Sequence, residues 1–92
     1  MFSAKQCEAA RLMTGTDTPD EQIVEEYAAM LGSNRNVAAM RLDGAVKQYS
    51  LPFEQAWEYA LKDFREIAAQ YGVSPATLLC LYIEWQSAKD EK

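Results

Sequence analysis

Apolar side chains recur along this chain at intervals of three and four residues, the spacing of an amphipathic α-helix. Ser, Thr or Pro opens each such stretch, and Gly follows most of them closely. Ser3 and Gln6, for example, have the spacing of a capping box, in which each residue binds the backbone N–H of the other. The pattern predicts four helices, over residues 3–13, 18–31, 52–71 and 75–88.

The second of these helices has the clearest start signal. Thr18 is the expected N-cap, Pro19 fits the first helical position, and Glu21 completes a capping box with Thr18. Five side chains are expected on the buried face of this helix: Ile23, Val24, Tyr27, Ala28 and Leu31.

Residues 36–49 fit two structures. Four apolar or aromatic residues have helical spacing: Ala39, Leu42, Val46 and Tyr49. However, Asp43 and Gly44 form a strong hairpin signal, and Gly44 would cost a helix about 1 kcal/mol relative to Ala. An isolated hairpin is marginal in water, and no other segment reads as a strand that could extend it. We therefore expect a helix over 36–49 and keep the hairpin as the alternative.

Together these elements predict an all-α fold, a compact bundle of about five short helices in one domain over residues 1–92. The helices at 52–71 and 75–88 hold seven of the ten aromatic residues, so we expect them to form the centre of the core. Phe64 and Ile67 are expected to be core residues, and truncating either to Ala should cost about 2–5 kcal/mol.

Residues 65–85 carry a further pattern. Ala68 is small where two helices would approach, Gly72 follows at a turn, and Ser74 with Pro75 opens the next helix. Apolar residues occupy the positions that would pack the two helices together: Ile67, Tyr71, Val73, Leu78 and Leu81. The segment resembles the general helix-turn-helix motif and no particular family. The resemblance implies a helical hairpin at the C-terminal end of the bundle, and in DNA-binding members the second helix enters the major groove.

The second helix departs from those DNA-binding members in its outward side chains, which in them are polar or basic. The matching positions here include no Lys or Arg: Ser74, Ala76, Thr77, Cys80, Ile83 and Glu84. The chain has 14 acidic and 9 basic residues and a net charge of −5, whereas phosphate contact requires a basic surface. The sequence therefore argues against a nucleic-acid partner. A helix-turn-helix transcriptional regulator that binds DNA is kept as the alternative function.

The helix at 75–88 is apolar on more than one side. A helix that is apolar all round is buried all round, so either the other helices surround it or part of it covers a partner protein. The candidate contact residues for a partner are Leu79, Ile83 and Gln86. A second copy of the chain is the first expectation, because two-fold dimers are the commonest oligomers.

A second candidate surface is acidic. No Lys or Arg occurs between Thr14 and Asn34. Glu21, Glu25 and Glu26 lie in this stretch, and part of its charge suits the positive end of a helix dipole. The three carboxylates form either a solvated face or a site for a basic partner. One form of such a site imitates the phosphate charge of DNA and inhibits a nucleic-acid-binding protein.

Residues for catalysis or metal binding are scarce. The chain has no His, no Gly-rich phosphate loop and no nucleophile motif. Its two cysteines, Cys7 and Cys80, are expected to be buried reduced thiols, with a disulfide between them as the alternative. We therefore expect no enzymatic activity, no cofactor, no metal and no small-molecule substrate.

The longest apolar run is far shorter than the roughly 20 residues of a membrane span, and no signal-peptide run is present. We expect a cytoplasmic protein without membrane contact. The sequence thus predicts a small, acidic, non-enzymatic protein-binding module, of the regulatory, accessory or inhibitory kind.

Overall fold

The computed structural model describes residues 2–90, which form five α-helices. The helices are α1 (Ala4–Thr14), α2 (Asp20–Ala29), α3 (Ser33–Lys47), α4 (Phe53–Tyr71) and α5 (Pro75–Asp90). The expected all-α helical bundle is confirmed. Among the described residues, no helix combines the length and the apolar character needed to cross a lipid bilayer.

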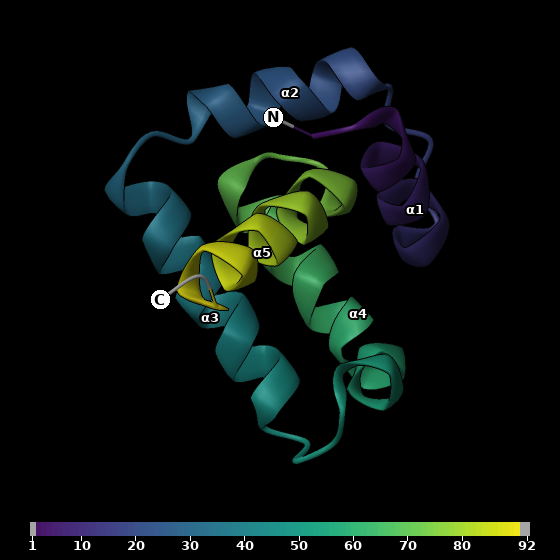
Figure 1. The fold of residues 1–92 in the computed structure, drawn as a ribbon, viewed down its shortest axis with the longest axis vertical. Helices are drawn as coiled ribbons and strands as arrows, with labels where there is room; N and C mark the ends of the chain where they lie inside the picture. Colours follow the sequence, from purple (N-terminus) through teal and green to yellow (C-terminus); the bar gives the residue numbers. More distant parts are fainter. Residues whose placement is uncertain (1, 91–92) are drawn as a thin grey trace.

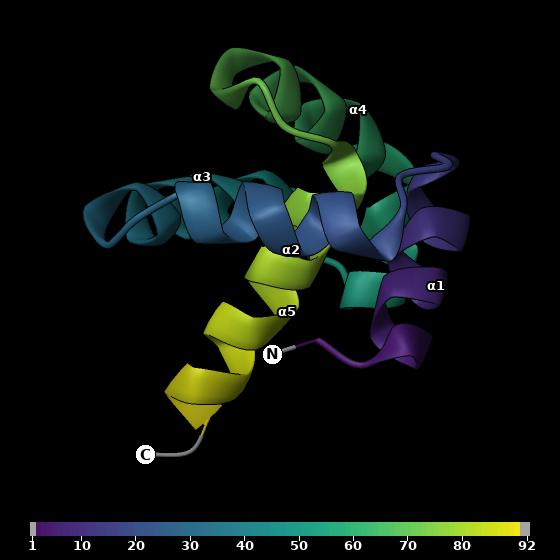
Figure 2. The same ribbon diagram turned by 90° about the horizontal axis from the view of Figure 1, so that it is seen from above.

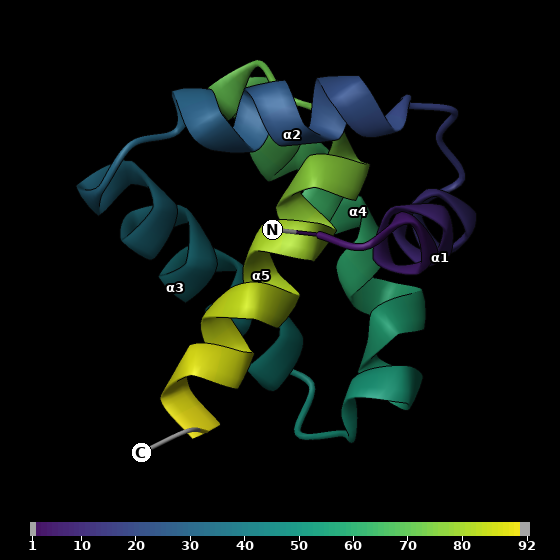
Figure 3. The ribbon, with the colours of Figure 1, turned by 45° about the horizontal axis from the view of Figure 1, so that its top comes forward.

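Helix α5 lies at the centre of the bundle and packs against each of the other four helices. Helix α2 crosses over the N-terminal half of α5, α1 and α3 flank it on opposite sides, and α4 lies behind it (Figures 1 and 3). All seven residues from 76 to 82 are buried. The C-terminal end of α5 extends away from the other helices (Figure 2). The first half of α5 is therefore a central helix surrounded by the other helices of its own chain. It is not a surface left open for a partner protein, which was the alternative.

Helices α4 and α5 form the centre of the core, as the aromatic residues predict. The ring of Phe64 is fully buried and lies edge-on to Trp57, with centroids 4.8 Å apart, and to Tyr82, with centroids 5.8 Å apart. Edge-to-face pairs of this kind add to the free energy gained from burying the rings. The indole N–H of Trp57 donates a hydrogen bond of 3.1 Å to the carbonyl of Met13, so this large side chain is buried without losing a hydrogen bond.

Helix α3 runs through Asp43 and Gly44, so the hairpin alternative is not formed. Leu42 and Val46 are buried against the core, which a helix allows because they are four residues apart. The carboxylate of Asp43 accepts a hydrogen bond of 2.9 Å from the Tyr82 hydroxyl of α5. These tertiary contacts stabilise the helix at a place where the local sequence also favours a turn.

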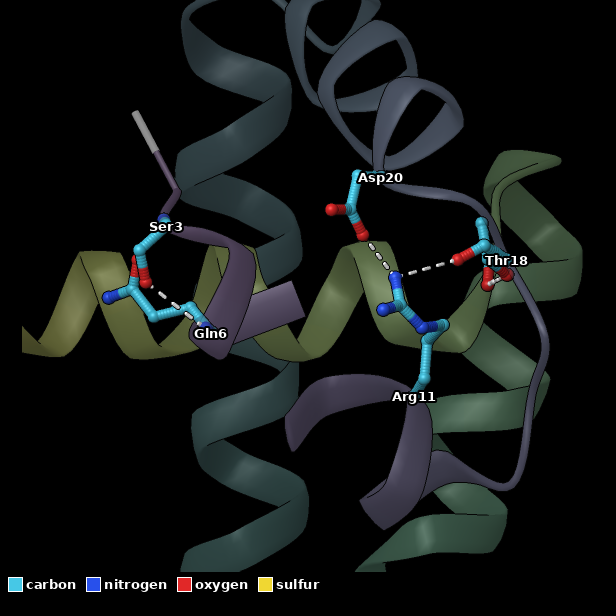
Figure 4. Close-up of polar contacts among 6 residues, drawn as sticks. Ser3, Gln6, Arg11, Thr18 and Asp20 are labelled. Atoms are coloured by element: carbon cyan, nitrogen blue, oxygen red, sulfur yellow. Dashed lines mark hydrogen bonds and ion pairs between the residues drawn. The ribbon is translucent and has the colours of Figure 1, made fainter. Parts of the chain in front are cut away.

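The start of α2 differs from the prediction. The N-cap is Pro19 rather than Thr18, and no side chain caps the helix. Thr18 instead makes a hydroxyl–hydroxyl contact with Ser74, 56 residues away in the chain. Arg11 of α1 donates to the Thr18 carbonyl and pairs with Asp20 (Figure 4). The Thr18 side chain is used to join this segment to the start of α5, and Arg11 joins it to α1.

The end of α2 also differs from the prediction. The helix ends at Ala29, and Met30 is buried in the place expected for Leu31. Leu31 is 69% exposed, although it was expected on the buried face, and Ala28 is exposed as well. Gly32, with a φ of 49°, turns the chain between α2 and α3, so Leu31 lies at an outward corner.

Helix α1 begins as predicted. The Ser3 hydroxyl accepts a hydrogen bond of 3.1 Å from the Gln6 backbone N–H, and the Gln6 side chain accepts one of 2.7 Å from the Ser3 backbone N–H (Figure 4). The helix ends at Thr14, and the C-cap residue Gly15 follows with a φ of 67°, which glycine adopts at little cost. Cys7 and Ala10 face inward and are buried where α1 packs against α5.

Candidate functional site

The turn between α4 and α5 is built from the residues that the sequence singles out. Gly72 adopts a left-handed conformation with a φ of 68°, and the Val73 N–H closes the end of α4 by donating to the Ala68 carbonyl at 3.0 Å. The Ser74 hydroxyl accepts a hydrogen bond of 3.2 Å from the Ala76 N–H and so caps the start of α5.

The side of α5 that a DNA-binding helix would present to a groove is covered. Ala76, Thr77 and Cys80 are all buried, and α1 and α2 pack against α5. Base-contacting residues normally lie in the first turns of a recognition helix and must be accessible there. In this structure the first exposed side chains of α5 are Ile83 and Glu84, one apolar and one acidic.

Glu26 of α2 helps to hold α2 over the start of α5. One of its carboxylate oxygens accepts hydrogen bonds from the Ser74 backbone N–H, at 3.0 Å, and from the Thr77 hydroxyl, at 2.6 Å. The other oxygen accepts one of 3.0 Å from the Gln22 side chain. A carboxylate of α2 thus caps the positive end of α5, where negative charge is stabilising.

The pKa of Glu26 reflects these contacts. Burial raises the pKa of this carboxyl, but the hydrogen bonds from Thr77, Ser74 and Gln22 favour the ionised form, and the result is a pKa below the ordinary value of 4.5. Glu26 was expected in an acidic interaction surface together with Glu21 and Glu25. Those two are exposed, whereas Glu26 is half-buried and engaged with α5, so the outward acidic surface of α2 is the pair Glu21 and Glu25.

The three residues of α5 that were expected to contact a partner lie on one side of the helix, at i, i+4 and i+7, but differ in burial. Leu79 is completely buried, with 0% exposure, so its expected place in a contact surface is wrong for this structure. Gln86 is half-buried and donates a hydrogen bond of 2.8 Å to the Tyr82 hydroxyl. Ile83 is 38% exposed and lines an open cleft. The three share one side of α5, and the bundle covers that side only as far as residue 82, so spacing alone did not show which of them would remain outside.

We call the cleft beside Ile83 the α1–α5 cleft. It has a volume of about 280 Å³ and lies between the N-terminal end of the chain with α1 on one side and α5 on the other. Its lining is Phe2, Gln6, Ala9, Cys80, Ile83, Glu84 and Ser87. Of these only Cys80 is buried, so its side chain forms the floor. The ring of Phe2 is held edge-on against Tyr27 of α2, with centroids 4.9 Å apart.

The thiol at the floor of the cleft is unreactive. The two thiols from opposite ends of the chain are free, and Cys80 is within hydrogen-bond reach of Cys7. Burial, together with the neighbouring Cys7, raises the pKa of the Cys80 thiol to about 12. The pKa of Cys7 is also raised, mainly by burial and then by Asp20. Both thiols are therefore protonated at neutral pH, and a protonated buried thiol behaves as a small apolar group.

The sequence pattern missed two features of the surface. It did not indicate that Phe2, Gln6 and Ala9 of the N-terminal region would face Ile83, because that pairing depends on how α1 packs. It also missed the outward side of α3, where Val37 is 49% exposed and Met40 is 64% exposed. A signal for the second feature is present in the sequence, since both residues lie opposite the buried stripe of α3 on a helical wheel.

Residues 2–90 contain no group of three or more His, Cys, Asp or Glu side chains arranged to hold a metal ion. Compared with known proteins, the chain matches no protein family model, no curated protein sequence and no solved structure.

Proposed function

We propose that this chain is a small, non-enzymatic protein-binding module, regulatory, accessory or inhibitory, that holds an apolar side chain of a basic partner protein in the α1–α5 cleft. The observation that carries the proposal is the cleft itself. Phe2 and Ile83 supply apolar walls, and the protonated Cys80 thiol supplies an apolar floor. Protein interfaces are commonly anchored by one aromatic or aliphatic side chain that fills such a pocket.

The lining of the cleft favours a protein side chain over a free small molecule. Its volume of about 280 Å³ is close to the lower end of the range of about 300–1,000 Å³ that is usual for small-molecule sites. Its three polar lining residues, Gln6, Glu84 and Ser87, are all exposed, so none of them is a buried group that would orient a small ligand. An anchor side chain needs no such groups, because the rest of the interface orients it.

The charge around the cleft favours a basic partner. Glu84 is the one charged residue among the described residues that line it. The whole chain carries a net charge of −5, which attracts basic proteins and repels nucleic acid. A Lys or Arg beside the anchor residue of the partner would lie within reach of the Glu84 carboxylate at the rim.

The proposal is tested by capture with a matched pair of variants. Tagged wild-type chain, Ile83→Asp and Leu12→Asp are used to capture proteins from a lysate of the source cells, and the captured proteins are quantified by mass spectrometry. Leu12 is the control, because it is an exposed apolar residue of α1 outside the cleft lining. A partner of the cleft is captured by wild type and by Leu12→Asp and is lost with Ile83→Asp.

The affinity of the purified partner sharpens this test. Ile83→Asp is expected to weaken binding by at least about thirtyfold, since anchor residues contribute about 2 kcal/mol or more. Binding of the wild type should also weaken as salt is added. Equal binding of both variants would contradict the proposal.

A DNA-binding regulator remains the competing function, and a mobility-shift titration at low salt separates the two. A DNA-binding protein shows a nonspecific Kd of about 10⁻⁴–10⁻⁶ M even at physiological salt and binds more tightly below it. We expect no shift with mixed DNA fragments. A shift that disappears on adding salt would favour the regulator and contradict the protein-binding proposal.

A further inference from the structure

A second hollow opens beside the α1–α5 cleft. It has a volume of about 240 Å³ and lies between α5 and the corner where α2 leads into α3. Its lining is Tyr27, Gly32, Arg35, Asn36, Leu81, Glu84, Trp85 and Ala88. Leu81, which is 1% exposed, forms the floor, as Cys80 does in the cleft. We call this hollow the Trp85 pocket.

The cleft and the Trp85 pocket are neighbours. Glu84 lines both of them, and the residues of α5 that line each follow adjacent sides of the helix. Phe2 of the cleft lies edge-on to Tyr27 of the pocket, with ring centroids 4.9 Å apart. Both hollows open where α5 emerges from the bundle, beyond the buried stretch that ends at residue 82 (Figure 2). One segment of a partner protein could therefore reach both.

The walls of the Trp85 pocket are aromatic and carry a fixed guanidinium group. The half-buried Arg35 donates a hydrogen bond of 3.1 Å from Nε to the Tyr27 carbonyl, and its guanidinium carbon lies 3.9 Å from the centroid of the Tyr27 ring. A planar guanidinium that covers one ring can stack on a second ring with its other face. The indole of Trp85 adds a further aromatic wall.

This lining selects a neutral aromatic side chain. A cationic side chain would meet Arg35 and an anionic one would meet Glu84, since both charges line the pocket. An aliphatic side chain would fill the space but gain nothing from the guanidinium, whereas the face of an aromatic ring attracts it. Tyr and Trp are also the side chains most enriched among the anchors of protein interfaces.

We propose that the partner protein places an aromatic side chain in the Trp85 pocket while its apolar anchor fills the α1–α5 cleft, with a Lys or Arg between the two at Glu84. This inference rests on the proposed function and adds the pattern by which the partner is recognised. Once one anchor is bound, the second binds within the same complex, so a partner with both anchors binds more tightly than one with either alone.

The first part of the test uses two small probes, N-acetyl-tyrosinamide and N-acetyl-leucinamide, each titrated separately into the isotope-labelled chain and followed by NMR. The tyrosine probe should shift the indole N–H of Trp85 and the methyl groups of Leu81 in a saturable way, with a Kd of about 1 mM for a ligand of this size. The leucine probe should shift the methyl groups of Ile83. Leu12, which is exposed and outside both linings, should not respond to either probe.

The second part joins the two anchors in one molecule. In a series of end-blocked peptides, one to four lysines separate a leucine from a tyrosine. The best member should bind at least about tenfold more tightly than either amide. The same peptide with serine in place of tyrosine is the control for attraction by the lysines alone, and it should lose this gain.

Variants of the chain assign the gain to the two hollows. Trp85→Ala removes a wall of the pocket, and Ala88→Leu fills the pocket from an exposed position on α5. Both should abolish the gain from tyrosine and leave the shift of Ile83 by the leucine probe. Ile83→Asp should abolish the gain but leave the shift of Trp85 by the tyrosine probe. Circular dichroism checks that each variant folds.

The outcomes separate this inference from the proposed function. If the tyrosine probe leaves Trp85 and Leu81 unshifted while the leucine probe shifts Ile83, the Trp85 pocket is wrong and the cleft is supported. If only Trp85 and Leu81 shift, the cleft fails, and the paired pattern fails with it. A peptide series that binds no more tightly than the amides, or equally well with serine, would overturn the joint use of the two hollows.

Discussion

The first half of α5 and the outward side of α3 are both apolar, yet their surroundings are opposite. All of residues 76–82 on α5 are buried, including Leu79, whereas Met40 on α3 is among the most exposed apolar side chains of the described chain. The difference comes from position in the bundle. Helix α5 packs against all four other helices, while α3 packs mainly against α4 and α5 and leaves its other side open. An apolar pattern therefore predicts that a surface is covered, and the topology decides whether the same chain covers it.

The largest change in the free energy of unfolding is expected when a buried side chain of the core is truncated. Leu79→Ala should lower the free energy of unfolding by about 2–5 kcal/mol, because it removes a fully buried side chain and leaves a cavity at the centre of the bundle. Phe64→Ala should cost a similar amount. Urea denaturation measures both changes, and a loss of less than about 0.5 kcal/mol at either position would contradict the central role of α5 and its contact with α4.

A smaller loss is expected when the carboxylate that caps α5 is neutralised. Glu26→Gln should cost about 1–2 kcal/mol at neutral pH, since it weakens the hydrogen bonds to Ser74 and Thr77 and removes a negative charge from the start of the helix. Glu25→Gln is the matched control on the same helix and should change the free energy of unfolding by less than about 0.5 kcal/mol. Equal effects at the two positions would argue against the cap.

The cap also predicts the pH dependence of stability. The pKa of Glu26 is lower in the folded chain than its ordinary value of 4.5, so the unfolded chain binds the proton more tightly. The stabilisation is complete above the ordinary pKa and is lost as the pH falls through the folded pKa. The difference in stability between wild type and Glu26→Gln, measured by urea denaturation at a series of pH values, should therefore shrink in acid. A difference that stays constant across the pH series would show that ionisation of Glu26 is not the source of the stabilisation.

Replacing glycine by alanine should change stability in opposite directions on the open side of α3 and at the turn that leads into α5. Gly44→Ala on the open side of α3 should raise the free energy of unfolding by about 0.5–1 kcal/mol, because the position is helical and has free space for a methyl group. Gly72→Ala should lower it by about 1–2 kcal/mol, because the φ of 68° at the start of the turn into α5 is unfavourable for Ala. Thermal denaturation of both variants checks the signs, and two changes of the same sign would contradict the account.

The smallest change in the free energy of unfolding is expected on the exposed side of α3. Met40→Ser should leave the free energy of unfolding of the single chain within about 0.5 kcal/mol of wild type, because the side chain gains little from the core. Urea denaturation measures this change in the free energy of unfolding. A loss approaching that of Leu79→Ala would show that Met40 packs against the chain after all.

The sequence predicted best those parts of the fold that depend on local spacing. The capping pair of Ser3 and Gln6 and the positive φ of Gly72 follow from neighbouring residues alone. The buried positions of Phe64 and Ile67 on α4 follow from the helical spacing of apolar residues over 52–71. Such features need only one helix and its ends to be read correctly.

The parts that the sequence did not predict depend on distant contacts. Thr18 and Glu26 both read as residues of α2 with local or surface roles, yet both meet Ser74 at the start of α5. Leu79 and Ile83 have the same apolar character, and only the packing of the other helices on α5 separates the buried one from the exposed one. Helical periodicity places a residue on a side of its own helix, but it does not say which helix lies opposite.

The central claim is that the first half of α5 is the fixed core of the bundle, which leaves contacts with a partner to its exposed edge around Ile83. Native-state hydrogen exchange of the backbone amides of residues 78–82, followed at increasing low concentrations of denaturant, tests this claim most directly. We predict that these amides exchange only through global unfolding, with an exchange free energy equal to that measured by denaturation. Exchange through a local opening, with a much smaller free energy and little dependence on denaturant, would contradict the claim. It would mean that α5 can separate from α1 and α2 and present its covered side to DNA or to another protein.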